Sequence, residues 1–165
     1  MRVRTRLDRR EENDASEHTY SAPIIQRVMV NRSLVDRIYD SILNSLESGV
    51  NLEDVLQKYM PLLYAEMDKL SLIYPEVKEI LHYAITNLWG KWFKEIPTPV
   101  FEEEDSILVI QMKIYDQLMK HHDKLMKKMR TSYTKSEAEK EIMYTTLFFM
   151  YSVCSFVFSQ LGVVV

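Results

Sequence analysis

The stretch that decides the fold is residues 142–165, IMYTTLFFMYSVCSFVFSQLGVVV, which contains no charged side chain. As a helix, at 1.5 Å per residue, it is long enough to cross a hydrocarbon layer of about 30 Å. Four hydroxyl residues recur at spacings of 7, 3 and 4 and would form a small-residue seam opposite Phe and Val side chains: Thr145, Ser152, Ser155 and Ser159. Such a seam is typical of a helix surrounded by protein, although small-residue seams also join helices inside bilayers. We expect burial among protein neighbours, and because so small a domain rarely surrounds such a helix alone, we expect other subunits to complete its cover.

The composition limits the function classes that fit the chain. Its 165 residues suit one domain, and the three Gly and five Pro disfavour phosphate-binding loops, dinucleotide-binding folds and many-turned β folds. The single Cys154 has no partner for an internal disulfide or for a cysteine-based zinc site. No apolar run of signal-peptide length follows the charged start, MRVRTRLDRR, so cleavage by that route is not expected.

Helical apolar spacing begins at Ser33, which we expect to cap a helix that ends at Gly49. Asn51 is expected to cap a second helix, with a kink at Pro61 and a continuation beyond it. Pro75 suits the first turn of a third helix. The segment IPTPVF, residues 96–101, predicts a rigid extended connector.

Two further helices are expected in the second half of the chain. The acidic run 102–105 would open the first, whose apolar seam recurs every three or four residues: Leu108, Met112, Tyr115, Met119, His122, Met126 and Met129. A second row would broaden this seam: Ile107, Ile114, Leu118 and Leu125. Ser136 with Glu139 predicts a capping box for the last helix, and Gly162 would follow its end. The fold class is therefore all-α, with about four main helices, one of them kinked, in a bundle over residues 33–165 behind an extended arm over residues 1–32.

Basic residues gather in two places that suit phosphate contacts. Alternating arginines at the chain start would lie on one side of an extended strand at intervals of about 6.8 Å, and the first ten residues carry a net charge of +4. Lys113, Lys120 and Lys127 recur every seven residues and would form a basic ridge on a helix. The simpler alternative for both places is solvated charge, with ion pairs to neighbouring acids on the ridge. The candidate phosphate contacts are Arg2, Arg4, Arg6, Arg9, Arg10, Arg27, Arg32, Lys120, Lys124, Lys127 and Lys128.

No residue set suggests catalysis, a metal site or a cofactor. His121 and His122 are adjacent and would diverge by about 100° on a helix, so they cannot chelate one ion together. Consecutive carboxylates at 102–105 point around a helix in the same way. Cys154 has no charged neighbour in sequence to activate it, so we expect it to act as a small apolar side chain and expect no enzyme.

In layout, the chain resembles the major coat proteins of filamentous archaeal viruses: an extended N-terminal arm ahead of a compact helical bundle that ends in a very apolar helix. That resemblance implies a virion protein that polymerises with itself or with a similar second coat protein. It also implies double-stranded DNA held in A form, and in some relatives a lipid envelope. The net charge of −3 would require the acids to face outward or toward a more basic companion subunit.

Two other functions remain open at this point. A tail-anchored membrane protein would place residues 142–165 in a bilayer with basic residues on its cytoplasmic side. A soluble helical adaptor would receive a partner helix in a groove lined by Met side chains.

Overall fold

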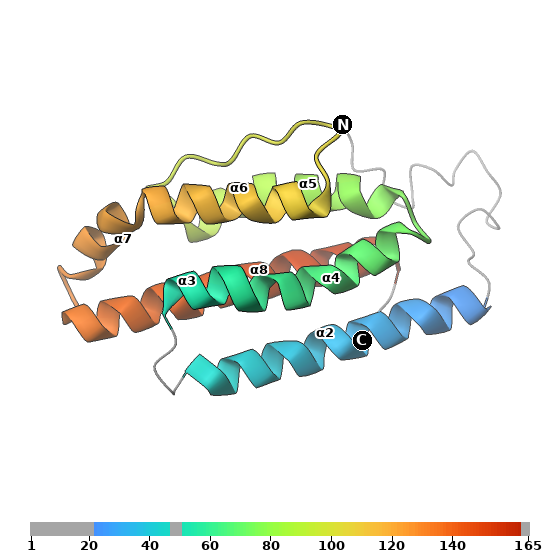
Figure 1. Ribbon diagram of the computed structural model, residues 1–165, viewed down its shortest axis with the longest axis horizontal. Coiled ribbons are helices and arrows are strands. Elements are labelled where there is room, and N and C mark those ends of the chain that lie inside the picture. The colour runs from blue at the N-terminus through green and yellow to red at the C-terminus, as the bar shows by residue number, and fades with distance from the viewer. Residues whose placement is uncertain (1–21, 47–50, 163–165) are drawn as a thin grey trace.

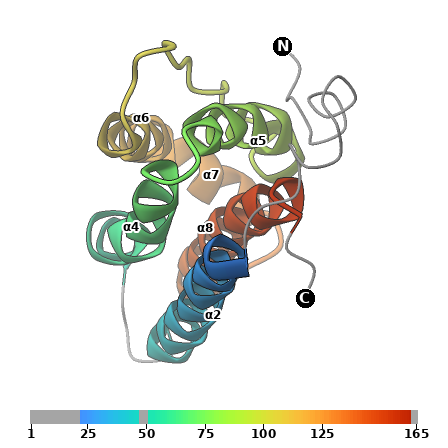
Figure 2. The same ribbon diagram turned by 90° about the vertical axis from the view of Figure 1, so that its right-hand side faces the viewer.

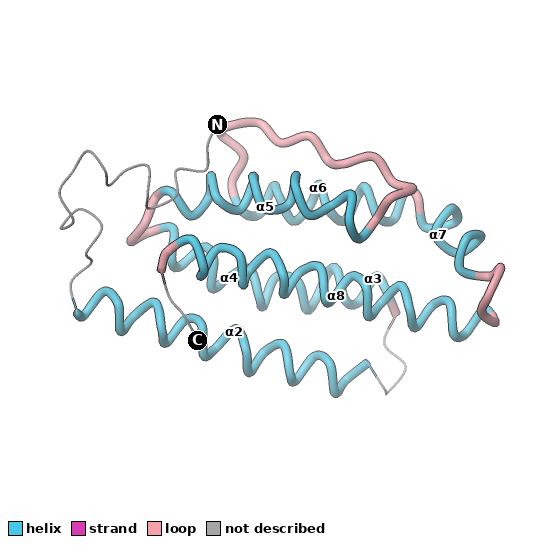
Figure 3. Tube along the Cα trace, turned by 180° about the vertical axis from the view of Figure 1, so that it is seen from behind, coloured by secondary structure: helices cyan, strands magenta, loops and turns pink. Residues whose placement is uncertain are grey.

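The computed structural model describes residues 22–46 and 51–162, and within these ranges every regular element is a helix (Figure 1, Figure 3). The all-α prediction is therefore confirmed for the described residues. The helices are α2 (Ala22–Ser45), α3 (Leu52–Asp54), the π-helix η3 (Val55–Tyr59), α4 (Met60–Ser71), α5 (Glu76–Trp92), α6 (Ile107–Lys120), α7 (His122–Met129) and α8 (Lys135–Gln160).

Helix α8, which carries the charge-free stretch, runs through the middle of the molecule with α2, α4, α5 and α7 packed around it (Figure 2). Many of its bulky residues are buried, while four aromatic side chains are half-buried: Tyr144, Phe148, Tyr151 and Phe156. Phe149 meets Trp89 of α5 and Phe93, the residue that follows α5, edge to face, with ring centroids 5.4 and 5.3 Å apart. The indole nitrogen of Trp89 donates a 2.9 Å hydrogen bond to the carbonyl of Ile96. These contacts make the α5–α8 interface the centre of the hydrophobic core.

The single chain already provides much of the cover of this helix, while the expectation that other subunits complete it stays a prediction. Eleven residues of α8 are buried within the single chain, because the preceding helices wrap around it. The hydroxyl seam faces outward instead: Thr145, Ser152 and Ser155 are half-buried and Ser159 is exposed. The apolar character of α8 is therefore explained largely by the core of one chain.

Helix α2 begins at Ala22, eleven residues before the expected cap, so the boundary of the extended arm at residue 32 is wrong. Val28 and Asn31 face the core at helical spacing with Val35. The side-chain amide of Asn31 donates a 2.8 Å hydrogen bond to the buried carboxylate of Glu66 on α4. This burial and this polar contact hold the early turns of α2 against the bundle. Ser33 is exposed in mid-helix, while Gly49 and residues 1–21 lie outside the described residues.

The second helix follows the prediction. Oδ1 of Asn51 accepts a 2.8 Å hydrogen bond from the backbone of Asp54, as a cap does. The helix continues past Pro61 through the π-helical turn of η3, in which the backbone of Met60 donates to the carbonyl of Val55. The wider turn lies immediately before Pro61, whose ring cannot fit a regular helix interior.

The connector between α5 and α6 forms as predicted, but the acidic run 102–105 belongs to it and does not open the next helix. Ser106 caps α6 instead, accepting a 3.2 Å hydrogen bond from the backbone of Val109. Helix α8 likewise begins two residues early, with a capping box of Thr134 and Glu137 in place of Ser136 and Glu139. Gly162 follows the end of α8 at a φ of 84°, as expected from its freedom to adopt that conformation.

The wide stripe formed by the predicted seam and its second row is covered only in part, because most of the seam is half-buried: Tyr115, Met119, His122, Met126 and Met129. The second row is buried, whereas Leu108 and Met112 of the predicted seam are 65% and 55% exposed. The single helix expected here is also interrupted at His121, which separates α6 from α7.

Candidate functional site

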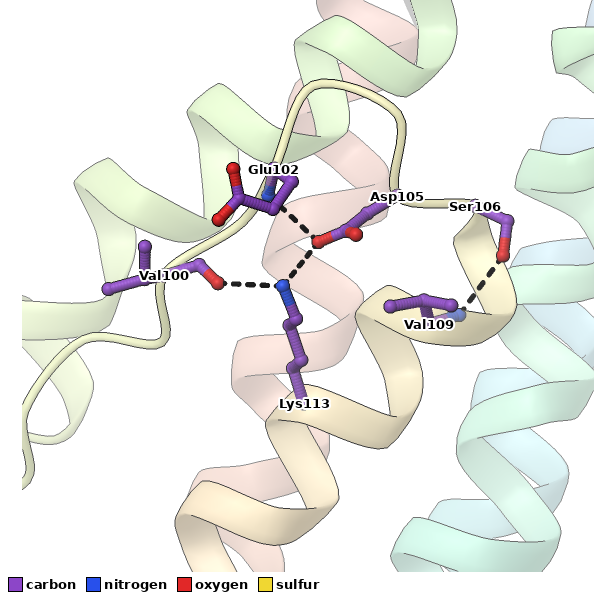
Figure 4. Close-up of polar contacts among 6 residues, drawn as sticks. All are labelled: Val100, Glu102, Asp105, Ser106, Val109 and Lys113. Carbon is purple, nitrogen blue, oxygen red and sulfur yellow. Dashed lines mark hydrogen bonds and ion pairs between the residues drawn. The ribbon is translucent and has the colours of Figure 1, made fainter.

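The connector, residues 94–106, is fastened to α6 by Lys113 (Figure 4). Its ammonium donates to the carbonyl of Val100 at 2.9 Å and to the carboxylate of Asp105 at 2.5 Å. The same carboxylate oxygen accepts from the backbone of Glu102 at 2.8 Å. The hydrogen bond from Lys113 and the backbone contact hold the pKa of Asp105 below its usual value. The charge of Lys113 is thus offset inside the fold.

Two more side chains fasten the connector farther along. Lys128 of α7 forms an ion pair with Glu95, and this hydrogen bond is the main cause of the lowered pKa of the Glu95 carboxyl. Gln117 of α6 donates to the carbonyl of Pro97 at 2.5 Å. Lys128, expected to contact phosphate, therefore has a partner within the chain.

Three of the predicted lysines remain as an exposed group, here called the basic surface: Lys120, Lys124 and Lys127. They lie at the end of α6 and on α7, at the end of the molecule where α7 leads into α8 (Figure 1). None of them forms an ion pair with another residue in the described ranges. Lys127 and Lys128 occupy the last turn of α7, where their positive charges interact favourably with the negative end of the helix dipole.

The two predicted arginines within the described residues, Arg27 and Arg32, lie apart from this surface. Arg27 is exposed on the early part of α2, at the opposite end of the molecule from α7 (Figure 1). Arg32 has partners within the chain, because it pairs with Asp36 at 3.5 Å and its guanidinium lies 5.4 Å from the ring centroid of Phe158. The remaining candidates lie outside the described residues: Arg2, Arg4, Arg6, Arg9 and Arg10.

An apolar groove, whose position the sequence did not predict, runs between η3 and the start of α4 on one side and α6 on the other. Its volume is about 450 Å³, and its lining includes Leu56, Met60, Pro61, Leu108, Met112, Gln111 and Asp116. Oε1 of Gln111 is buried and has no hydrogen-bond partner among the described residues. The signal was present in the sequence as the Leu108 and Met112 repeat, but that repeat alone does not distinguish a core seam from a surface groove.

Two other titratable side chains of the described residues have pKa values shifted by burial. Half-buried His82 stacks on Phe101 of the connector with ring centroids 5.3 Å apart, and desolvation lowers its pKa. Desolvation raises the pKa of the fully buried Cys154 thiol, which keeps it protonated and unreactive. Within the described ranges, no group of three or more His, Cys, Asp or Glu residues is placed to hold a metal ion.

Comparisons with family models, curated proteins and solved structures find no match to the chain. Among the described residues, α8 is the one helix long and apolar enough to span a membrane, and 56% of its most apolar 18-residue window is buried inside the molecule.

Proposed function

We propose that the protein is a non-enzymatic coat protein that binds double-stranded DNA through sequence-independent phosphate contacts and polymerises along it. The observation that carries the proposal is the basic surface, three exposed lysines with no ion pair among the described residues. The other two lysines of the predicted ridge, Lys113 and Lys128, are held by acids of the connector.

Helix stability alone does not account for the cluster. Lys124 has Lys127 and Lys128 at the i+3 and i+4 positions, and like charges at such spacing destabilise a helix by a few tenths of a kcal/mol, roughly. A phosphate backbone relieves this repulsion, because each ammonium contact displaces a condensed counterion.

Such contacts set the position of a protein on a duplex without reading bases, which suits a coat that must accept any sequence. The five arginines of residues 1–10 would add to the basic surface in this role. The acids that bring the whole chain to −3 would then face solvent or a more basic companion subunit.

The salt dependence of DNA binding tests the proposal. Each lost phosphate contact lowers the slope of log K against log salt by about 0.9, so changing all three lysines to Gln should lower it by about 2.7. The assay is fluorescence anisotropy with two unrelated duplexes of equal length, which should bind alike.

Lys58→Gln is the matched control for a single Lys124→Gln change, since Lys58 is exposed and pairs with Asp54 away from the basic surface. The control should leave the slope unchanged. An unchanged slope in the triple variant would refute the role of the basic surface, and removal of residues 1–12 in the same assay tests the arm.

The membrane-anchor alternative would require α8 to leave the core. Its bulky side chains already have apolar partners in the chain, so the apolar sequence needs no bilayer to explain it. Alkaline extraction of a membrane fraction separates the two proposals, because a tail-anchored chain stays in the pellet.

A further inference from the structure

The apolar groove is also lined by Gln57 and Tyr115, which carry donors, but two of its acceptors have no donor among the described residues. Its buried polar atom, Oε1 of Gln111, lacks a partner among the described residues, and its acidic lining residue, Asp116, is an exposed carboxylate that forms no ion pair there. Leu108 and Met112 expose most of their side chains beside these two groups. An occupant that fits the groove therefore brings an apolar side chain together with a cationic donor.

The outer face of α2 offers that combination on the same molecule. Met29 and Val30 are each 53% exposed there. Arg27 and Arg37 stand three residues before and seven residues after Val30, so both lie on the same side of the helix as its side chain. Both arginines are exposed, and neither forms an ion pair with a described residue.

We propose that the groove between η3/α4 and α6 of one copy receives the outer face of α2 of a second copy. Val30 and Met29 fill the apolar floor beside Met112, and an α2 arginine forms an ion pair with the exposed carboxylate of Asp116. This interface rests on the proposed function, because it would provide the polymerisation that a coat protein requires.

The two surfaces differ, so the contact is of the head-to-tail kind. Each copy would use its α2 face on one neighbour and its groove on the next, because α2 packs on the other side of α4 from α6 (Figure 2). Head-to-tail contacts generate either closed rings or open helical filaments. The basic surface at the α7 end belongs to neither half of the interface, so it would remain available along such an assembly.

Two blocking variants test the proposal in the full-length chain without DNA. Val30→Asp removes the α2 half and Met112→Asp removes the groove half, and both positions are exposed enough to leave the fold intact. In analytical ultracentrifugation, the wild-type protein should associate beyond a dimer as its concentration rises, while each variant alone should stay monomeric.

A 1:1 mixture of the two variants is the decisive sample. Each variant retains one intact half, so the mixture should form a dimer of twice the monomer mass and nothing larger. Leu72→Asp, at an 83% exposed position outside both surfaces, is the control and should associate as the wild type does. Circular dichroism checks that all three variants keep wild-type helicity.

Three outcomes would overturn the interface: a wild-type protein that stays monomeric at its highest soluble concentration, a variant mixture that stays monomeric, or a Val30→Asp protein that associates like the wild type. The groove would then serve another occupant. Because the lysines are untouched, retained DNA binding with its full salt slope would leave the phosphate-binding proposal standing while the interface fails.

Discussion

Helix α8 and the outer side of α6 exchange the roles that their sequences suggest. The charge-free stretch of α8 looks as if it needs outside partners, yet much of it is buried inside one chain. The Met-rich repeat of α6 looks like a core seam, yet Leu108 and Met112 are mostly exposed beside an apolar groove. Apolar spacing thus shows which residues share a face, whereas the packing of distant helices decides whether that face is covered.

The comparison also shows which apolar face is less well covered by other helices. Helix α8 is covered by α2, α4, α5 and α7 together. Among the described elements, the groove side of α6 faces only η3 and α4. The groove therefore leaves Leu108 and Met112 more exposed than the bulky residues of α8.

The largest expected effect separates these two regions directly. Phe149→Ala should lower the free energy of unfolding by about 3–5 kcal/mol, because it leaves a cavity against Trp89 and Phe93 in a fully buried site. Met112→Ala should change it by no more than about 0.5 kcal/mol at low protein concentration. Urea unfolding followed by circular dichroism measures both. Equal losses would mean that α8 is no better covered than α6.

A smaller effect compares the inner and outer faces of α2 at adjacent positions. Asn31→Ala removes a donor from the buried carboxylate of Glu66, which leaves Lys69 as its donor at 2.9 Å, and should cost about 1–3 kcal/mol. Val30→Ala, on the exposed face, should cost less than about 0.5 kcal/mol. The same urea titration applies to both variants.

Ser33→Ala is the control for where α2 begins. Since Ser33 is exposed in mid-helix, its loss should be close to neutral. If Ser33→Ala lowered the free energy of unfolding by about 1 kcal/mol and Asn31→Ala left it unchanged, the result would indicate that the helix begins at Ser33 after all.

The smallest effect concerns His82, at the edge between the core and the connector. Burial holds its pKa below the value of about 6.5 in an unfolded chain, so the unfolded state takes up the proton first as pH falls. The contribution of His82 to stability is therefore full above about pH 6.5 and declines below it. His82→Gln should lose less stability than the wild type between about pH 8 and about pH 5.5, measured by urea unfolding. A steeper loss in the variant would reverse the sign of this interpretation.

Local sequence rules predicted which segments are helical better than they predicted the residue at which each helix begins. The pattern Ser, two residues, then an acid occurs at both Ser33 and Ser136, and neither is a cap. Asp36 instead accepts from Tyr151 and pairs with Arg32, whereas Thr134 with Glu137 satisfies the capping rule two residues before Ser136. Asn51 was identified correctly because no competing cap lies beside it.

The candidate site was only partly predictable for a related reason. The pairing of Lys113 with Asp105 spans eight residues and that of Lys128 with Glu95 spans 33, so helix-spacing rules could not exclude these lysines from the ridge. The groove depends on the approach of η3 and α6, two segments about fifty residues apart in the chain. Lys120, Lys124 and Lys127 kept the exposure that their helix positions indicate.

The only sulfhydryl of the sequence, Cys154, sits in the middle of α8 with no exposed surface. An alkylating reagent can reach this thiol only when the helix separates from its neighbours. The alkylation rate of the native protein therefore measures how often the core opens. The unmodified protein thus carries its own reporter of whether α8 ever leaves its neighbours, in water or in the presence of lipid.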